Sequence, residues 1–140
     1  MINFHYETDF QLDNEKRFSN WIIQLVRSEE KEAGTINYIF CDDTYLHKIN
    51  VNYLDHDTLT DIISFDYSNG SLIEGDIFIS IERVKENATE FEVAFENELK
   101  RVMAHGILHY CGYTDKTVKD REIMRQKEEE KMVLFDSKKI

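Results

Sequence analysis

Proline is absent from this chain of 140 residues, and glycine occurs only five times. At an average usage near 5%, about seven prolines would be expected. Turns must therefore be built from glycine, asparagine, aspartate and serine. Cysteine is also scarce, since Cys41 and Cys111 are the two present. In a chain without export signals such a pair is expected to remain as free thiols.

Long hydrophobic runs are absent as well. No apolar stretch approaches the ~18 residues needed to cross a bilayer, so no membrane-spanning segment is expected. The start of the chain, MINFHYETDF, lacks the basic region and apolar stretch of a signal peptide. We therefore expect a cytoplasmic protein with no membrane partner.

Basic residues are few: 17 lysines and arginines stand against 28 acids, which gives a net charge of −11. A protein that relied on non-specific attraction to nucleic acid would be basic overall. Any contact with nucleic acid must therefore come from a local patch or be guided by a partner. The content of 41% hydrophobic and 12% aromatic residues predicts a packed globule. The length suits one domain over residues 1–140.

The first half of the chain alternates strand and helix patterns. Residues 2–7 have strand-like alternation, and residues 12–31 carry one apolar stripe at helical spacing. Gly34 is interpreted as the end of that helix, and residues 35–41 as a second strand. A short helix over residues 42–54 follows, opening on two aspartates that are candidate N-caps.

The second half begins with a hairpin and continues in helices. Two β-rich runs flank Asn69 and Gly70, a pair suited to a type I′ turn because both central residues need positive φ. Residues 81–112 have helical periodicity, with a break before a second piece that Thr89 is expected to cap. Residues 116–140 predict a charged amphipathic helix, and its run KEEEK is interpreted as a solvated face.

These elements predict an α+β fold. A strand–helix–strand start allows a parallel pair of strands, whereas a hairpin is antiparallel. The most economical arrangement is a single domain with one mixed sheet of about four strands covered by helices.

The stretch AHGILHYCGYTDKT, residues 104–117, carries the strongest chemical signal. His105 and His109 are four apart, so on a helix they lie one turn apart on the same face and can point at one metal ion. Gly112 can adopt the left-handed conformation that ends a helix, which would turn Asp115 back toward the two histidines. Zinc accepts such a His, His, Asp set, with a fourth position open to water.

Gly106 occupies the position where a zinc protease has a glutamate, so the general base of that chemistry is missing. Because it lacks a side chain, it also allows another element to pack closely beside His105. The alternative to a metal site is a partly buried helix face with hydrogen-bonded histidines.

Three blocks in order resemble one known family. HGILHYCGYTD is similar to the H-G-x-L-H-x-x-G-Y-D-H signature of the YbeY family, bacterial metal-dependent endoribonucleases implicated in ribosomal RNA maturation and ribosome quality control. TDIISF and EGDIFIS resemble the family's T-D-V-L-S-F and G-D-I-x-I-S blocks, and the likeness runs from about Ile49 to Asp115. The resemblance implies a compact α+β fold with a metal-bearing helix like that of the zincins. It also implies one zinc ion held by three ligands, here His105, His109 and Asp115.

The chain departs from the family pattern at several positions. Asp115 replaces the usual third histidine and Thr114 the usual aspartate, but a carboxylate is a legitimate zinc ligand. Leu54 stands where most members have an arginine thought to serve RNA or phosphate, and Leu59 replaces a proline.

The missing arginine matters because charge that develops at a phosphorus centre needs a cationic partner. Lys48, His56 and Arg101 are candidate substitutes, and Arg101 lies one helical turn before His105.

Proton transfer would need a group other than a glutamate after His105, and the candidates are Asp61, Asp76 and Glu98. Glu98 precedes His105 by seven residues on nearly the same helical face, which suits orienting an imidazole. The alternative for Glu98 is an ordinary surface acid. Asp61 and Asp76 are expected to set strand ends rather than to transfer protons.

The leading hypothesis is a zinc-dependent single-strand endoribonuclease that acts in rRNA processing and ribosome quality control by metal-activated attack of water on a phosphodiester. Its catalytic residues would be His105, His109, Glu98 and Arg101. The expected partner is RNA of the ribosome or its precursor, with ribosome-associated proteins as further candidates and neither DNA nor a membrane.

Two other functions stay open. A ribosome-assembly factor that binds RNA or protein, with a mainly structural metal, is favoured by Leu54 and by the net charge of −11. A metalloprotease is suggested by the histidine spacing and disfavoured by Gly106.

Overall fold

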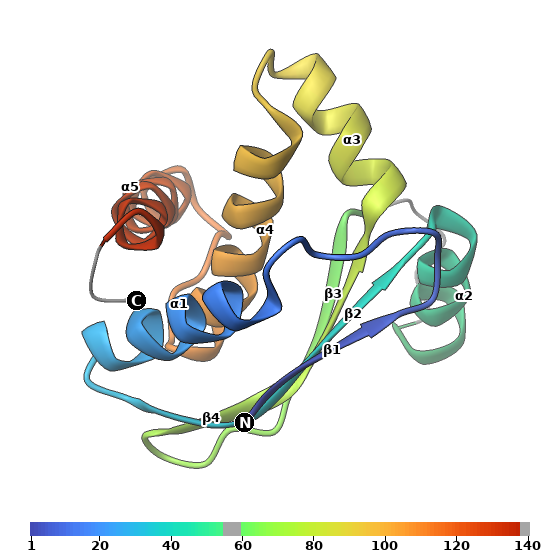
Figure 1. Ribbon diagram of the computed structural model, residues 1–140. Coiled ribbons are helices and arrows are strands. Elements are labelled where there is room, and N and C mark those ends of the chain that lie inside the picture. Colours follow the sequence, from blue (N-terminus) through green and yellow to red (C-terminus); the bar gives the residue numbers. More distant parts are fainter. Residues whose placement is uncertain (55–59, 138–140) are drawn as a thin grey trace.

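A mixed four-stranded sheet is the centre of the fold in the computed structural model, which describes residues 1–54 and 60–137 (Figure 1). The elements of these residues are β1 (Ile2–Tyr6), α1 (Glu15–Ser28), β2 (Glu32–Cys41), α2 (Asp43–Leu54), β3 (Ile62–Asp66), β4 (Leu72–Ser80), α3 (Ile81–Glu90), α4 (Phe95–Tyr110) and α5 (Val118–Phe135). The strand order is β1-β2-β4-β3, with β1, β2 and β4 parallel and β3 antiparallel to β4. The predicted α+β fold with a mixed sheet of four strands is confirmed.

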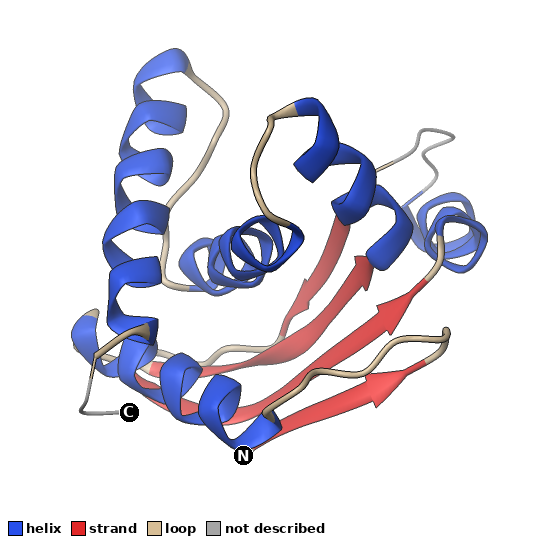
Figure 2. Cartoon of the chain, turned by 45° about the horizontal axis from the view of Figure 1, so that its top comes forward, coloured by secondary structure: helices blue, strands red, loops and turns tan. Residues whose placement is uncertain are grey.

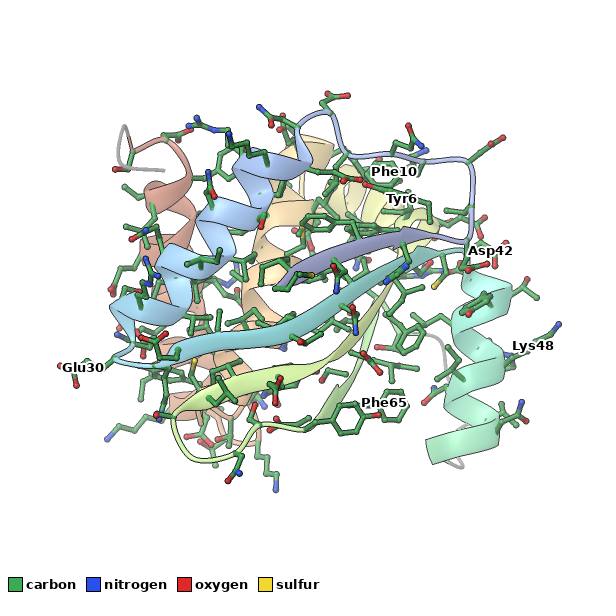
Figure 3. The ribbon with its side chains drawn as sticks, turned by 60° about the horizontal axis from the view of Figure 1, so that its bottom comes forward. Tyr6, Phe10, Glu30, Asp42, Lys48 and Phe65 are labelled. Carbon is green, nitrogen blue, oxygen red and sulfur yellow. The ribbon has the colours of Figure 1, made fainter. Side chains whose placement is uncertain are left out.

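The helices are divided unequally between the two faces of the sheet. α1 and α4 lie over one face, and α5 packs against both of them (Figure 2). On the other face α2 covers one end, where its Leu46 packs with Cys41 and Ile63 (Figure 3). α4 therefore lies between the sheet and α5, so its side chains can meet groups from both.

The apolar stripe of α1 forms much of the core, as its spacing predicts. Ile22 and Leu25 are completely buried, and each such side chain contributes about 1.5–3 kcal/mol on burial. Trp21 is also fully buried, and its indole Nε1 donates to the backbone carbonyl of Lys131 at 2.8 Å. This bond satisfies the polar atom of the ring and ties α1 to the last helix.

The predicted end of the first helix is wrong. α1 ends at Ser28, and Glu30, with φ of 60°, makes the left-handed turn that follows. Gly34 lies inside β2, next to a shift of register in the pairing with β4. A Cβ atom there would come within 2.5 Å of the Cγ of Glu74, so this glycine allows a close approach across the sheet.

The hairpin between β3 and β4 is present, but its turn differs from the predicted type I′. Asn69 and Leu72 exchange backbone hydrogen bonds of 3.0 and 3.1 Å, which makes Gly70 and Ser71 the central residues. Of these two, Gly70 alone has positive φ, at 62°. Positive φ at the first central residue alone is the pattern of a type II′ turn.

The break between the two later helices also lies further along the chain than predicted. Thr89 is inside α3, where its hydroxyl donates to the carbonyl of Lys85 at 3.1 Å. α4 starts at Phe95, and its N-cap residue, Ala94, makes no side-chain capping bond. The prediction that Thr89 caps the second helix is therefore wrong. Glu92, with φ of 58°, turns the chain between the helices without a glycine.

The run KEEEK in α5 is not a uniformly solvated face. Glu128 and Lys131 are buried, with 2% and 1% of their surface exposed, whereas Glu129 and Glu130 between them are exposed. α5 is held at its start by Thr117, whose hydroxyl accepts from the amide of Asp120 at 3.0 Å. One side of this charged helix therefore faces the protein interior.

Three further predictions concern smaller features. Cys41 and Cys111 are free thiols, as expected. Within residues 1–54 and 60–137, no helix is long and apolar enough to span a membrane. His56 and Leu59 lie outside the described residues, and so does the side chain of Leu54.

Candidate metal centre

Gly106 lets α4 approach the sheet closely beside His105. A Cβ atom at this position would lie 3.1 Å from the Cδ1 atoms of both Ile62 and Ile77, which belong to β3 and β4. The prediction that another element packs here is confirmed, because the side chains of the two strands meet the helix at this glycine. A larger residue here would require the side chains of Ile62 and Ile77 to shift by a few tenths of an ångström.

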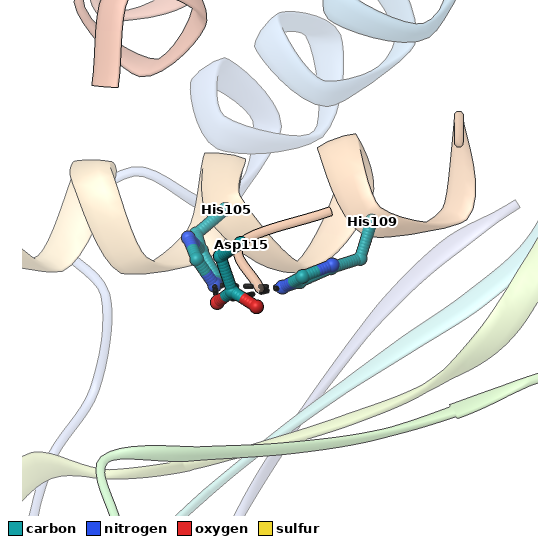
Figure 4. A group of neighbouring side chains, drawn as sticks. All are labelled: His105, His109 and Asp115. Carbon is teal, nitrogen blue, oxygen red and sulfur yellow. Dashed lines mark hydrogen bonds and ion pairs between the residues drawn. The ribbon is translucent and has the colours of Figure 1, made fainter. Parts of the chain in front are cut away.

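Gly112 ends α4 and reverses the chain, as predicted. Its φ is 106°. The backbone amide of Gly112 donates to the carbonyl of His109 at 3.0 Å, and the backbone amide of Tyr113 donates to the carbonyl of Leu108 at 3.0 Å. This pair of bonds is a Schellman motif, in which a glycine takes the left-handed conformation. The turn brings Asp115 back beside the two histidines of the helix (Figure 4).

The side chains of His105, His109 and Asp115 converge on one point, as Figure 4 shows. The Nε2 atoms of the histidines are 2.9 Å apart, and each lies 3.5 Å from Oδ2 of Asp115. Ligand atoms at ~2.0–2.2 Å from a tetrahedral zinc ion are about 3.4 Å apart. The three residues named from the sequence therefore lie together, and their atoms are close enough to one another to hold a metal ion.

The hydrogen bonds behind the two imidazoles also favour a cation between them. Nδ1 of His109 donates to the carbonyl of Tyr113 at 2.9 Å, and Nδ1 of His105 donates to the carboxylate of Glu128 at 2.6 Å. With both protons on Nδ1, both Nε2 atoms present lone pairs to the same point, beside the carboxylate of Asp115. Such a set of acceptors is mutually repulsive unless a cation or a shared proton lies among them.

Glu128 is the centre of a buried chain of charges behind His105. Its Oε2 accepts from His105 and its Oε1 from Nη1 of Arg101 at 3.1 Å, while Nε of Arg101 donates to Glu98 at 3.0 Å. Glu98 and Glu128 are both 2% exposed. Burial alone lowers the pKa of the Arg101 guanidinium, but the two carboxylates raise it above its ordinary value. Arg101 is therefore a cation that is already neutralised by two buried acids.

The contacts of Glu128, Arg101 and Glu98 change the roles that were expected of these residues from the sequence. The carboxylate on the His105 imidazole is Glu128, not Glu98, which is one step further away behind Arg101. Glu98 is not a surface acid either, since it is buried. Arg101 lies next to the metal ligands, but its guanidinium serves Glu98 and Glu128.

The other acids considered for proton transfer are placed differently. Asp76 lies on the opposite face of the sheet, where its Oδ1 accepts from the side-chain amide Nδ2 of Asn37 at 2.9 Å. Asp61 lies just before β3, and burial raises the pKa of its carboxyl, partly offset by the positive charge of Arg101. Its backbone carbonyl accepts from Ser80 at 3.0 Å, which fits the expected role at a strand end.

A second network holds the loop that carries Asp115. The phenol of Tyr113 donates to Glu29 at 2.6 Å, and Glu29 forms ion pairs with Lys131 at 2.6 Å and with Lys127 at 3.3 Å. Lys131 is 1% exposed and also donates to Oγ of Ser28 at 2.9 Å. α5 thus supports both histidines, one through Glu128 and the other through Tyr113.

Comparison with known proteins places this site in a family. The family model described as "Endoribonuclease YbeY" matches residues 2–136. The chain belongs to the endoribonuclease YbeY family. A relative in Flavobacterium johnsoniae, named Endoribonuclease YbeY, is 67% identical over 96% of this chain and 97% of its own length. Another with the same name, in Flavobacterium psychrophilum, is 61% identical over 99% of each chain.

The fold of the YbeY family chain is also similar to a solved structure. The solution structure of TM1509 from Thermotoga maritima matches with a TM-score of 0.67 and 26% sequence identity, over 96% of this chain and 89% of the other. The resemblance noted in the three sequence blocks is thereby extended to nearly the whole chain.

Sequence reasoning missed Glu128 and Lys131. Both lie in the run KEEEK, residues 127–131, in which every residue is charged. The buried residues of α5 recur at intervals of four, three and four residues, at Met124, Glu128, Lys131 and Phe135, and this spacing could have marked them as one face. The charges of the residues hid the pattern, because lysine and glutamate are seldom fully buried unless paired.

Proposed function

We propose that this member of the endoribonuclease YbeY family is a zinc-dependent endoribonuclease that cuts single-stranded RNA. Membership of the family makes the chain a hydrolase of RNA phosphodiesters. The finer proposal is that one zinc ion is held by His105, His109 and Asp115. We further propose that the substrate is ribosomal RNA or its precursor, and that the enzyme acts in the cytoplasm during rRNA maturation and ribosome quality control.

The observation that carries the zinc proposal is the convergence of three acceptor atoms within 2.9–3.5 Å of one another. Zinc bound there would supply a Lewis acid and lower the pKa of a water molecule to about 7. An open hollow beside the proposed ligands is lined by His105, Asp115, Arg121 and Arg125. Two of the three proposed ligands can therefore be reached from solvent.

The other residues act by holding the ligands. Glu128 fixes the proton of His105 on Nδ1 and the carbonyl of Tyr113 fixes that of His109, so each ring presents Nε2 to the site. Arg101 balances the charge of Glu128 and keeps its carboxylate in place, and Glu98 in turn holds the guanidinium of Arg101. We assign Glu98 and Arg101 to positioning the ligands, in place of direct roles in proton transfer or phosphate binding.

The test is an RNA cleavage assay with parallel metal analysis. Zinc-loaded protein should cut a labelled single-stranded oligoribonucleotide, lose that activity when the metal is chelated, and regain it when zinc is restored. His109→Ala should abolish both zinc retention and cleavage, whereas His5→Ala, which removes an exposed histidine on β1, should change neither. Cleavage that survives both chelation and His109→Ala would overturn the proposal.

The alternative of an assembly factor with a structural metal makes a different prediction in the same assay. The protein would retain zinc and bind RNA, but it would produce no more product with zinc than with chelator.

A further inference from the structure

Arg121 and Arg125 of α5 flank the metal centre on its solvent side. Both are exposed. Four residues of helix advance about 6 Å and return to the same face, so the two guanidiniums form a short row. A hollow of about 160 Å³ is lined by both arginines together with His105 and Asp115. The candidate metal ligands and the two arginines therefore share one open surface.

These two arginines differ from Arg101, which lines the same hollow. Arg101 is held by the buried carboxylates of Glu98 and Glu128. Arg121 makes a single long contact, from Nη1 to the backbone carbonyl of Asp115 at 3.4 Å. Arg125 makes no hydrogen bond or ion pair with any residue that the structure describes. Their charges are thus available to an anion outside the protein.

A second hollow, of about 380 Å³, lies beside the first, since Arg101 and Arg125 line both. Its other wall is the turn between α3 and α4, where Phe91 is 52% exposed. Glu129 also lines this hollow, so the positive charge is concentrated toward the metal centre. Basic side chains along a groove, with an exposed aromatic ring beside them, are the features that bind single-stranded nucleic acid.

We propose that Arg121 and Arg125 bind phosphates of single-stranded RNA next to the bond that is cut, and that Phe91 stacks on a base further along the strand. The inference rests on the proposed function, because it takes RNA as the substrate. It supplies the local basic patch that a chain with a net charge of −11 needs. It also provides cations in a chain whose Leu54 stands where most members of the family have an arginine.

The binding test uses metal-free protein in excess chelator, so that the RNA is not cut. The affinity for a labelled twelve-nucleotide oligouridylate is measured by fluorescence anisotropy between about 50 and 200 mM salt. The logarithm of the binding constant falls with the logarithm of the salt concentration, and each phosphate contact contributes about 0.7 to this slope for single strands. The double variant Arg121→Gln with Arg125→Gln should bind about tenfold more weakly and lose about 1.4 of the slope. Phe91→Ala should weaken binding about tenfold with an unchanged slope, because stacking does not release counterions.

Two controls separate this row from net charge. Arg27→Gln removes one charge from an exposed site on α1 and should change neither affinity nor slope. The double lysine variant, Arg121→Lys with Arg125→Lys, should keep most of the slope because it keeps the charges.

The outcomes distinguish this inference from the proposed function. If the double glutamine variant binds with wild-type affinity and slope, or if the wild type binds no oligouridylate, the inference is overturned, whether or not the enzyme cuts RNA. If the wild-type protein cuts no RNA, but the double glutamine variant binds RNA more weakly and with a smaller salt slope than the wild type, the RNA site stands and the proposed nuclease activity fails.

Discussion

α4 and α5 contribute to the same centre in opposite ways. α4 and the turn after it carry the three candidate ligands within a stretch of eleven residues, His105 to Asp115. α5 carries none of them, but its buried Glu128 and Lys131 hold the ligands from behind. The ligands follow from local spacing on one helix, whereas the groups that hold them depend on how two helices pack. The motif on α4 therefore identifies the candidate ligands, but it does not include the α5 residues that hold them in position.

The largest effect is expected from changing a ligand on the α4 side. Asp115→Ala should lose the bound zinc and all measurable cleavage, because two histidines alone leave the site one protein ligand short. Asp115→His, which restores the residue usual in the family, should retain both. Metal analysis of the purified proteins, together with the oligonucleotide assay, checks this. A full equivalent of zinc in Asp115→Ala would mean that Asp115 is not a ligand.

The next effect is expected from the ion pair that anchors α5. Glu29→Gln removes the carboxylate at 2.6 Å from the buried ammonium group of Lys131 and leaves the exposed Glu130, at 3.2 Å, as its remaining carboxylate partner. Breaking a buried pair in this way costs about 3 kcal/mol. The free energy of unfolding in urea should fall by that amount, even in metal-free protein. Glu130→Gln is the matched control, since the side chain of Glu130 is 59% exposed, and it should cost well under 1 kcal/mol. Equal losses in the two variants would contradict the distinction between the faces of α5.

A smaller effect is expected from the α5 residue that contacts a ligand directly. Glu128→Gln removes the charge behind His105 while keeping the shape, and it should weaken zinc binding by about 10–100-fold, the range for such supporting residues. Competition with a chromophoric chelator measures the affinity without reference to activity. Glu129→Gln, one residue along and exposed, should leave the affinity unchanged. If both variants bind zinc like the wild type, Glu128 has no part in positioning the ligand.

The smallest effect is a dependence of stability on pH. Burial alone raises the pKa of the Glu29 carboxyl, but its bonds to Lys131 and Tyr113 lower it below the ordinary 4.5. Because the folded-state pKa is depressed, Glu29 contributes stability that is fully present above about pH 4.5 and is lost as the pH falls below it. The free energy of unfolding of metal-free protein, measured in urea at pH 7 and in acid, should therefore fall more between the two pH values for the wild type than for Glu29→Gln. Parallel losses would contradict this assignment.

Several elements of the fold could be predicted from local pattern. The apolar stripe of α1, the alternation in β1 and the β-rich runs on either side of the hairpin turn were sufficient because burial selects one face of each element. The failures were at turns. Gly34 was taken for a helix end, yet Glu30 makes that turn and Gly34 serves the approach of Glu74. A glycine in a sequence does not reveal whether it provides positive φ or space.

The candidate site divides in the same way. His105, His109, Gly112 and Asp115 are close in sequence, so helix geometry and one left-handed turn were enough to bring them together. Glu128 lies 23 residues after His105, and its role depends on the packing of α5 against α4. Glu98 was correctly placed on the face of His105, but the contact it makes is with Arg101.

Spacing along the chain was therefore sufficient for the three candidate ligands and the turn that gathers them, because these depend on contacts between near neighbours. The strand order of the mixed sheet depends on pairs that are distant in sequence, such as Ile2 with Ile36 and Ile36 with Gly75. Which charged residues of α5 are buried, which carboxylate orients His105, and which arginines stay open to solvent depend on contacts between helices that are distant in sequence. Local physics places a side chain on a face of its helix. The packing of the whole chain determines whether that face meets water, a metal ligand or an ion of opposite charge.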